Sequence, residues 1–346
     1  MENILITGGA GYVGSHITLN ILKRGLKVIV LDSFVNSSKD VFNNFCKVID
    51  KKILKRNFKI ITGDIRDKKL LNDIFEDNAK RECAISSVIH CAGLKSVQTS
   101  IINPKEYWDV NVLGTMNLVD IMESYSCKKI IFSSSATVYD PSEGDLLHEN
   151  SRISPINPYG STKFVVEKFL EDIHKSSKNE WKCINLRYFN PIGADPEGII
   201  GESPLKEKNN IFPLIMDVAS KKLEKFTIFG NDWDSSDGTC VRDYIHIDDL
   251  AESHIRALEY LNNNTPVFMN LNVGTGEGTS VLELIKKFEE TNQISIPFIY
   301  GERRKGDFGT VVADNRLAKK VLAWIPKKDL KDMCKDGWNW FSNTNI

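Results

Sequence analysis

Two side chains that could move a proton lie four residues apart in the sequence Tyr159-Gly160-Ser161-Thr162-Lys163. If this stretch is helical, the phenol of Tyr159 and the ammonium of Lys163 share one helix face. A neighbouring ammonium favours the phenolate, so we expect Lys163 to lower the pKa of Tyr159 from its ordinary value of about 10. Tyr159 would then be a usable general acid and base. The pair alone is weak evidence, because helices carry Tyr and Lys at this spacing by chance.

A dinucleotide-binding pattern near the N-terminus supplies what the pair lacks. The apolar run 4–7 is followed by glycines at Gly8, Gly11 and Gly14, a helical pattern over 15–24 and a second apolar run over 28–31. This order is typical of a Rossmann βαβ unit, in which backbone N–H groups and a helix N-terminus bind pyrophosphate. Asp32 ends the second run, where it can hydrogen-bond a ribose and repel a 2′-phosphate, so NAD is favoured over NADP. The alternative interpretation is an ordinary tight turn between strand and helix.

Strands and helices alternate along the first half of the chain. Apolar runs at 60–62, 87–90 and 129–132 predict buried strands, and the stretches 69–78 and 107–124 predict helices. The alternation predicts an α/β fold with a Rossmann-type, doubly wound parallel sheet. Such sheets bind ligands at the carboxyl ends of their strands, so Asp64, the turn 91–93 and the hydroxyls of 133–137 are expected near the cofactor.

The composition limits the class of function. The chain has 346 residues, of which 45 are basic and 46 acidic, so its charge gives no reason to bind nucleic acid or an anionic membrane. Seven cysteines without a CxxC pair and six histidines without metal-ligand spacing predict reduced thiols and no metal. The N-terminus does not have the pattern of a signal peptide, and no apolar stretch approaches the ~20 residues of a membrane span, which predicts a cytoplasmic protein.

These motifs resemble those of the extended short-chain dehydrogenase/reductases, at 7–16, 133–139 and 159–163. The similarity is closer to the UDP-glucose 4-epimerase family, whose motifs are matched at 92–95, 186–191, 229–232 and 241–246. Related sugar-nucleotide dehydratases typically carry Thr-Asp-Glu where this chain has Ser135-Ala136-Thr137, and Ala136 and Thr137 cannot do acid–base chemistry at neutral pH. The resemblance implies an isomerase of galactose metabolism that inverts C4 of UDP-glucose and UDP-galactose through a transient 4-keto sugar, using bound NAD.

The resemblance also implies the site residues. Tyr159 would be the acid and base, Lys163 its electrostatic partner and a ligand of the nicotinamide ribose, and Ser135 the hydroxyl that holds the sugar O4. The implied NAD contacts are Gly8, Gly11, Tyr12, Val13, Asp32, Asn36, Ser37, Asp64, Ile65, Cys91, Lys95, Tyr159, Lys163 and Phe189. The implied UDP-sugar contacts are Ser135, Tyr159, Asn190, Asn210, Phe229, Arg242, Arg304 and Asp307.

A guanidinium fork suits diphosphate oxygens, which supports Arg242 and Arg304 as ligands. A surface ion pair is the ordinary alternative for an arginine, and we expect it for Arg303. The chain departs from the family at Asp140, where Gly is usual, and at Cys91, where Phe is usual. The family places Val311 near the C2 substituent of the sugar, and its modest size suggests UDP-GlcNAc and UDP-GalNAc as further substrates.

The C-terminal half is expected to form a smaller α/β substrate-binding domain. We expect an NAD-binding Rossmann domain over 1–188, with a returning segment around 240–262, and a UDP-sugar-binding domain over 189–346. Ser280 and Glu283 match a capping box that would begin a helix over 281–288. The family resemblance implies a homodimer. The alternatives are another NAD-dependent nucleotide-sugar dehydratase or dehydrogenase, or a non-catalytic NAD-binding regulator.

Overall fold

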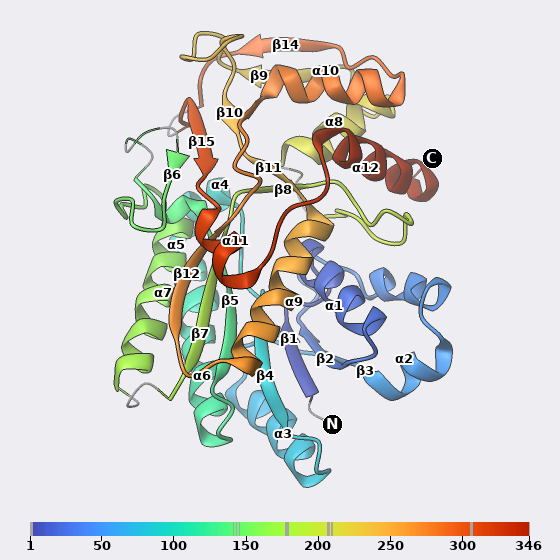
Figure 1. Cartoon of the computed structure of the whole chain (residues 1–346). Coiled ribbons are helices and arrows are strands. Elements are labelled where there is room, and N and C mark those ends of the chain that lie inside the picture. Colours follow the sequence, from blue (N-terminus) through green and yellow to red (C-terminus); the bar gives the residue numbers. More distant parts are fainter. Residues whose placement is uncertain are drawn as a thin grey trace. The chain divides into compact units, whose positions relative to one another are not determined.

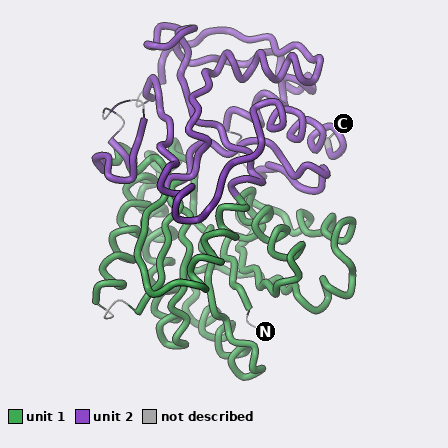
Figure 2. Tube along the Cα trace, viewed as in Figure 1, with its two compact units in different colours: residues 1–138, 155–187, 251–271 green, residues 139–154, 188–250, 272–346 purple. Residues whose placement is uncertain are grey.

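The computed structural model describes residues 3–140, 142, 144, 146–176, 180–205, 208, 210–304 and 307–345 (Figure 1). The chain divides into two compact units (Figure 2). Unit 1 contains residues 1–138, 155–187 and 251–271, and unit 2 contains residues 139–154, 188–250 and 272–346. Each unit is therefore assembled from segments that are far apart in the sequence.

Unit 1 is built on a seven-stranded sheet with the strand order β12-β7-β5-β4-β1-β2-β3. Its strands are β1 (Asn3–Thr7), β2 (Lys27–Asp32), β3 (Phe58–Thr62), β4 (Ile85–His90), β5 (Lys129–Ser135), β7 (Lys182–Tyr188) and β12 (Phe268–Val273). β1 pairs in parallel with both β2 and β4, and the pairs β2–β3 and β4–β5 are also parallel. The expected doubly wound parallel sheet is thus confirmed. The order reverses at β1, whose carboxyl end is where sheets of this kind bind ligands.

Helices of unit 1 pack on this sheet through apolar faces. They are α1 (Tyr12–Lys23), α2 (Lys51–Asn57), α3 (Lys68–Lys80), α4 (Val97–Ile102), α5 (Pro104–Tyr107), α6 (Gly114–Ser124), α7 (Pro158–Ser176) and most of α9 (Ile247–Asn263), with 3₁₀ turns η1 (Lys39–Lys47) and η3 (Ala136–Val138). Buried side chains of α3, α6 and α7, such as Phe75, Leu118 and Leu170, share one core with the strand residues Leu5 and Ile130. The helices therefore hold the strand ends in place.

The stretch predicted as one helix over 107–124 contains an irregular turn. α5 continues into a π-helical turn η2 (Trp108–Leu113), after which α6 begins at Gly114. A π turn holds one extra residue and is frequent at functional sites. Here it carries Asn111, which is 3% exposed.

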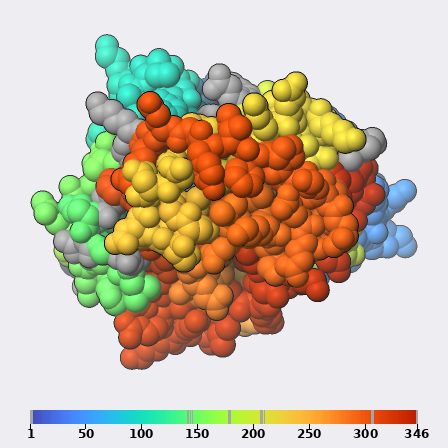
Figure 3. Space-filling view, turned by 90° about the horizontal axis from the view of Figure 1, so that it is seen from above, coloured from blue at the N-terminus to red at the C-terminus, as the bar shows by residue number. Residues whose placement is uncertain are grey.

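Unit 2 has three small sheets, with strand orders β13-β10-β15-β6, β11-β8 and β14-β9. Its strands are β6 (Leu146–Leu147), β8 (Asn190–Ile192), β9 (Phe226–Phe229), β10 (Val241–Arg242), β11 (Tyr244–His246), β13 (Thr279–Ser280), β14 (Phe298–Gly301) and β15 (Thr310–Ala313). Its helices are α8 (Ile211–Ala219), α10 (Val281–Asn292), α11 (Arg316–Leu322) and α12 (Leu330–Asn345). β9 and β14 pair in parallel, and yellow and orange parts of the chain adjoin on the face shown in Figure 3.

The expected capping box at the start of α10 is confirmed. The Ser280 hydroxyl accepts from the Glu283 N–H at 3.0 Å, and the Glu283 carboxylate accepts from the Ser280 N–H at 2.7 Å. Phe212 of α8, Phe288 of α10 and Phe341 of α12 then meet in the core of unit 2. Within the residues described, no helix is both long and apolar enough to cross a membrane.

Candidate active site

The start of α7 brings Tyr159 to the end of β5. Asn157 begins the helix, because its side-chain oxygen accepts from the Gly160 N–H at 2.8 Å. A Cβ atom on Gly160 would lie 2.4 Å from the Thr137 carbonyl oxygen, so only glycine lets the helix approach the turn after β5 this closely. The approach places the Tyr159 phenol close enough to the Ser135 hydroxyl for the serine to lower the pKa of the phenol.

Lys163 lies one turn further along α7 and is 5% exposed. Its Nζ atom donates to the Ser133 carbonyl oxygen at 2.7 Å and lies 4.7 Å from the centre of the Phe132 ring. The same atom is 5.8 Å from the centre of the Tyr159 ring. Tyr159 and Lys163 therefore share one helix face, as their spacing predicts.

Burial controls the protonation of this pair. It raises the pKa of Tyr159 to about 12, although the hydrogen bond with Ser135 acts in the opposite direction. Burial also lowers the pKa of Lys163 to about 8, and the nearby Cys91 and Glu167 partly offset that change. The prediction that Lys163 lowers the pKa of Tyr159 is therefore wrong for the protein in this state. Removal of the phenolate from water raises the pKa by more than the Ser135 hydroxyl lowers it.

The three serines at the end of β5 have three different partners. Ser133 donates to the Cys91 sulfur at 3.1 Å, and Ser134 donates to the Glu167 carboxylate at 2.5 Å. Ser135 accepts from the Thr137 hydroxyl at 3.0 Å and from the Thr137 N–H at 3.2 Å. Ser135 is also the serine that acts on the pKa of the Tyr159 phenol, which fits its predicted part in the site.

Sequence reasoning missed a buried ion pair beneath this site. The Arg187 guanidinium donates to both oxygens of Glu167, at 2.9 and 2.7 Å, and the two side chains are 2% and 3% exposed. Glu167 lies one turn after Lys163 on α7, so the four-residue spacing that pointed to Tyr159 and Lys163 could have found it. Its partner on β7 could not be found from the sequence.

Asn111 is a second neighbour that the sequence did not single out. Its side chain accepts from the Leu94 N–H at 2.8 Å and donates to the Leu94 carbonyl and to the Thr162 hydroxyl, both at 3.1 Å. It therefore joins the turn after β4 to the first turn of α7. The only indication of Asn111 in the sequence was a polar residue between apolar ones within a predicted helix.

The glycine-rich turn after β1 is packed closely against neighbouring backbone. Gly8 has a φ of +71°, and a Cβ atom there would lie 2.6 Å from the Ala92 nitrogen. A Cβ atom on Gly14 would lie 2.2 Å from the Gly8 carbonyl oxygen. Gly11 is the N-cap of α1 and has no side chain that could occupy the helix N-terminus, next to Tyr12 and Val13. The backbone at this end of α1 can therefore receive pyrophosphate.

Asp32 connects this turn to the loop after β2. Its carboxylate accepts from the Ala10 N–H at 2.9 Å, from the Phe34 N–H at 2.8 Å and from the Ser37 hydroxyl at 3.0 Å. Asn36 is exposed in the same loop. The carboxylate is thus held at the tip of β2, where an adenosine ribose would lie in a dinucleotide site.

The remaining predicted NAD contacts of unit 1 follow β3 and β4. Asp64 pairs with Arg66 at 2.7 Å, and its hydrogen bonds with Arg66 lower the pKa of the carboxyl. Ile65 is buried, whereas Lys95 is exposed. Burial raises the pKa of the Cys91 thiol to about 11, so this thiol is not a reactive nucleophile at neutral pH. Phe189, the last of the predicted contacts, is buried in unit 2.

Four of the predicted UDP-sugar contacts lie in two groups in unit 2. Arg242 on β10 lies opposite Val311 on β15 and donates to the Gly309 carbonyl oxygen at 3.2 Å. The Arg304 guanidinium lies 3.8 Å from the centre of the Phe229 ring, and the Asp307 N–H donates to the Arg304 carbonyl oxygen at 3.1 Å.

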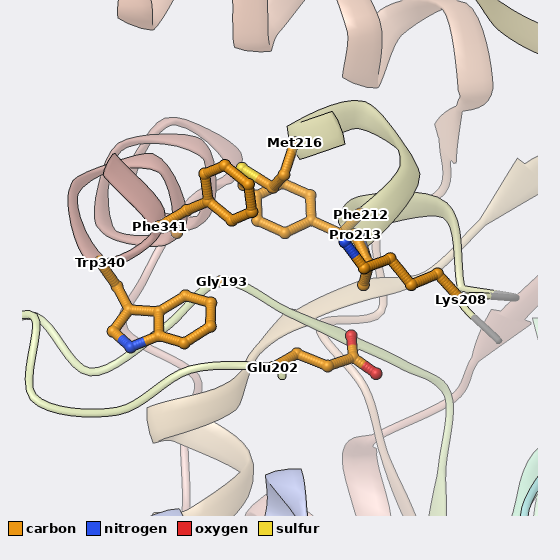
Figure 4. A pocket seen from close by; sticks show the side chains of 9 residues that line it. Gly193, Glu202, Lys208, Phe212, Pro213, Met216, Trp340 and Phe341 are labelled. Atoms are coloured by element: carbon orange, nitrogen blue, oxygen red, sulfur yellow. The ribbon is translucent and has the colours of Figure 1, made fainter. Parts of the chain in front are cut away.

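The other predicted contacts of unit 2 lie on neighbouring elements. The Asn190 N–H of β8 donates to the carbonyl oxygen of Asp243, which follows Arg242. Asn210 precedes α8, and its amide donates to the Glu202 carboxylate at 2.6 Å. Glu202 also lines a small pocket with Phe212, Met216 and Trp340 (Figure 4). With a volume of about 20 Å³, this pocket holds about one water and no sugar.

Comparisons with known proteins agree with this arrangement. The family model described as GDP-mannose 4,6 dehydratase matches residues 5–337. A UDP-glucose 4-epimerase of Bacillus subtilis (strain 168) is 44% identical over 98% of this chain and 97% of its own length. The enzyme GEPI48 of Cyamopsis tetragonoloba, also a UDP-glucose 4-epimerase, is 43% identical over 99% of this chain and 95% of its own.

Solved structures give the same result. The UDP-glucose 4-epimerase from Bifidobacterium longum, in complex with NAD+ and UDP, superposes with a TM-score of 0.91 at 37% identity, over 99% of this chain and 98% of its own. The Stenotrophomonas maltophila enzyme, with bound NAD and formylated UDP-arabinopyranose, superposes with a TM-score of 0.90 at 38% identity over the same shares of the two chains.

Proposed function

The chain belongs to the GDP-mannose 4,6 dehydratase family and, within it, to the UDP-glucose 4-epimerases, and we propose that it inverts C4 of UDP-hexoses reversibly with bound NAD. UDP-glucose and UDP-galactose are the proposed substrates, and a 4-keto sugar is the intermediate. The observation that carries the proposal is the placement of Tyr159 and Lys163 on one face of α7, with the Tyr159 phenol in reach of the Ser135 hydroxyl. Ala136 and Thr137 supply no carboxyl group there, which favours epimerisation over dehydration.

Unit 1 fits NAD at the glycine-rich turn. Gly8 and Gly14 leave no room for a Cβ atom, which lets the turn and the start of α1 pack closely, and we propose that the backbone N–H groups there bind the pyrophosphate. We assign the pyrophosphate to Gly8, Gly11, Tyr12 and Val13. We assign contacts with the adenosine to Asp32, Asn36, Ser37, Asp64 and Ile65. Contacts with the nicotinamide and its ribose are assigned to Cys91, Lys95, Tyr159, Lys163 and Phe189. NAD, when bound, accepts a hydride from C4 and returns it.

The protein's own residues would then move the proton. At neutral pH Lys163 is cationic and Tyr159 holds its proton, because their pKa values are about 8 and about 12. Tyr159 is therefore ready to return a proton to O4. To accept one, its phenolate needs the ammonium of Lys163 and the hydroxyl of Ser135 as stabilising partners. The keto sugar would turn in the site between the two half-reactions.

Unit 2 carries the proposed contacts to the UDP-sugar. Arg242 and Arg304 suit the diphosphate, and Asn190, Asn210, Phe229 and Asp307 complete the set. We accordingly propose that residues 1–188, with a returning segment around 240–262, bind NAD and that residues 189–346 bind the UDP-sugar. Arg304→Ala should weaken UDP binding and leave NAD retention unchanged.

The direct test supplies purified protein with UDP-galactose, without added NAD+, and follows the sugar products by chromatography. Formation of UDP-glucose is expected. Its absence from protein that contains NAD would refute the proposal. Tyr159→Phe should abolish turnover while NAD stays bound, and Tyr260→Phe on α9 is the matched control, with turnover unchanged. Accumulated NADH, seen at its absorbance band, would indicate a dehydrogenase instead, and a keto-sugar product would indicate a dehydratase.

Val311 motivates the wider substrate range. It lies on β15 opposite Arg242 and is half-buried, and the family resemblance places it beside the C2 substituent. We propose turnover of UDP-GlcNAc and UDP-GalNAc in addition to the simple hexoses. Val311→Tyr should reduce turnover of UDP-GalNAc more than that of UDP-galactose. No turnover of UDP-GalNAc by the natural protein would end this part of the proposal.

The proposed oligomer is a homodimer, and an apolar surface of unit 1 supports it. Ile101, Ile102, Trp108, Leu113 and Met116, on α4, η2 and α6, are 41% to 76% exposed. Ile102→Glu with Trp108→Glu should convert a dimer into a monomer in light-scattering measurements, whereas Ile325→Glu, at a residue 62% exposed elsewhere, should not. A monomeric natural protein would contradict this. A cytoplasmic location is proposed as well, since no disulfide joins any of the seven cysteines, all of which lie among the described residues.

A further inference from the structure

Arg303 is held more firmly than its expected part as an ordinary surface ion pair requires. Its Nε atom donates to the Asp232 carboxylate at 2.7 Å, and its Nη2 atom donates to the Asp232 carbonyl oxygen at 2.5 Å. The guanidinium carbon also lies 3.9 Å from the centre of the Trp233 ring. An exposed ion pair alone contributes little, but a planar fork that also stacks on an indole is held in one orientation.

Trp233 is itself fixed by the backbone around it. Its indole N–H donates to the Phe229 carbonyl oxygen at 3.2 Å, and its backbone N–H donates to the Gly238 carbonyl oxygen at 2.9 Å. Gly230 has a φ of +85°, and a Cβ atom there would lie 2.4 Å from the indole nitrogen and 2.9 Å from Arg303 Cγ. The glycine thus leaves the space in which the Arg303–Trp233 stack forms.

This stack contacts the two segments that carry the arginines proposed to hold the diphosphate. Gly301 at the end of β14 pairs with Phe229 at the end of β9. Arg304 follows three residues later, and its guanidinium lies 3.8 Å from the centre of the Phe229 ring. On the other side, a Cβ atom on Gly309 would lie 3.5 Å from the Trp233 ring. The Gly309 carbonyl oxygen accepts from Arg242 at 3.2 Å. Trp233 is therefore adjacent to both segments.

We infer that Arg303 and Trp233 are positioning residues that hold Arg304 and Arg242 in the geometry that receives the UDP diphosphate. The inference rests on the proposed function, because it concerns the same UDP-sugar site. Its physical basis is preorganisation. A long arginine side chain loses rotational freedom when it binds a ligand, and this loss costs binding free energy. The cost is smaller when the backbone that carries the side chain is already fixed in the free protein. Arg303 directly precedes Arg304, so its contacts anchor the backbone from which Arg304 extends.

The test measures binding of UDP to the NAD-containing protein by calorimetry, together with KM and kcat for UDP-galactose. Arg303→Ala should weaken UDP binding and raise KM by roughly tenfold, while kcat changes less than about twofold. Arg303→Lys keeps the charge but loses the fork and the stack, so an intermediate effect is expected. Trp233→Leu should act in the same direction as Arg303→Ala. Arg256→Ala, at an equally exposed arginine with two ion pairs in unit 1, should leave both constants unchanged.

The outcomes separate this inference from the proposed function. If the natural protein does not bind UDP, the proposed function fails. If the natural protein binds UDP and Arg303→Ala binds it equally well, or loses kcat at an unchanged KM, the inference is overturned. Asp232→Asn removes the partner's charge with little change of shape. It should raise KM by roughly threefold, and it serves as the second variant if Arg303→Ala unfolds.

Discussion

Replacement of Glu167 by Gln removes one charge from the buried ion pair between α7 and β7. The Glu167 carboxylate accepts from Arg187 at 2.9 and 2.7 Å and from the Ser134 hydroxyl at 2.5 Å. Gln has nearly the same shape, but its amide group offers donors where a carboxylate oxygen accepted from Arg187. The substitution therefore leaves the Arg187 guanidinium buried without a counter-charge.

The size of the effect follows from burial. With side chains only 3% and 2% exposed, neither group can recover its hydration in the folded protein. Loss of one partner of such a pair costs about 3–5 kcal/mol of unfolding free energy. A protein in the middle or upper part of the ordinary range, about 5–15 kcal/mol, stays folded at 25 °C after that loss. The melting temperature should fall by roughly 4–7 °C.

The assay is thermal and urea unfolding, followed by circular dichroism. Glu171→Gln is the matched control, because it makes the same change one turn further along α7. The partners of Glu171 are the exposed Lys168 and Lys175, whose Nζ atoms lie 3.1 and 2.6 Å from its carboxylate oxygens. It should unfold like the natural protein. In the double variant with Arg187→Met, which leaves no unpaired charge, part of the lost stability should return. Equal melting temperatures for Glu167→Gln and Glu171→Gln would refute the reasoning.

Three further predictions concern protonation and the cofactor. Burial lowers the pKa of His90 to about 3, so between about pH 6.5 and 3 the imidazole is protonated in the unfolded chain and neutral in the folded protein. The unfolding free energy should therefore fall by about 1.4 kcal/mol for each pH unit as the pH drops through this interval. His90→Gln should reduce this slope in urea titrations. Lys163→Met should abolish turnover yet raise the unfolding free energy near pH 7, because a buried cation is removed. This gain should shrink between about pH 8 and 10.5, because in that interval Lys163 of the natural protein is neutral in the folded state and still charged in the unfolded state. Gly14→Ala should purify without NAD, measured by absorbance of the denatured protein, since its Cβ atom would lie 2.2 Å from the Gly8 carbonyl oxygen.

Local patterns predicted the parts of the molecule that depend on neighbours in the sequence. The glycines at Gly8 and Gly14 and the carboxylate of Asp32 lie within one βαβ unit, and each has the surroundings that its spacing indicated. The capping box at Ser280 and the shared face of Tyr159 and Lys163 are of the same kind. In each of these cases the information spans fewer than about 30 residues.

Properties set by distant segments could not be predicted. The direction of the pKa change of Tyr159 depends on burial by the folded chain, which helix spacing does not report. The partner of Glu167 lies on another strand, and the stack of Arg303 on Trp233 joins residues 70 positions apart. The π turn around Asn111 adds a residue to a helix without any change in composition. Most of these features surround the site, where burial and long-range contacts decide the chemistry.

The strand order of unit 1 also has a consequence for how the chain is synthesised. β7 (Lys182–Tyr188) gains its outer neighbour β12 (Phe268–Val273) only after about 80 more residues have been made. At 5–20 residues per second this takes roughly 4–16 s, during which an apolar strand has an open hydrogen-bonding edge. The nascent chain is thus a substrate for chaperones in that interval. A fragment that ends before β12 should aggregate when expressed alone, however complete its nucleotide-binding motif looks.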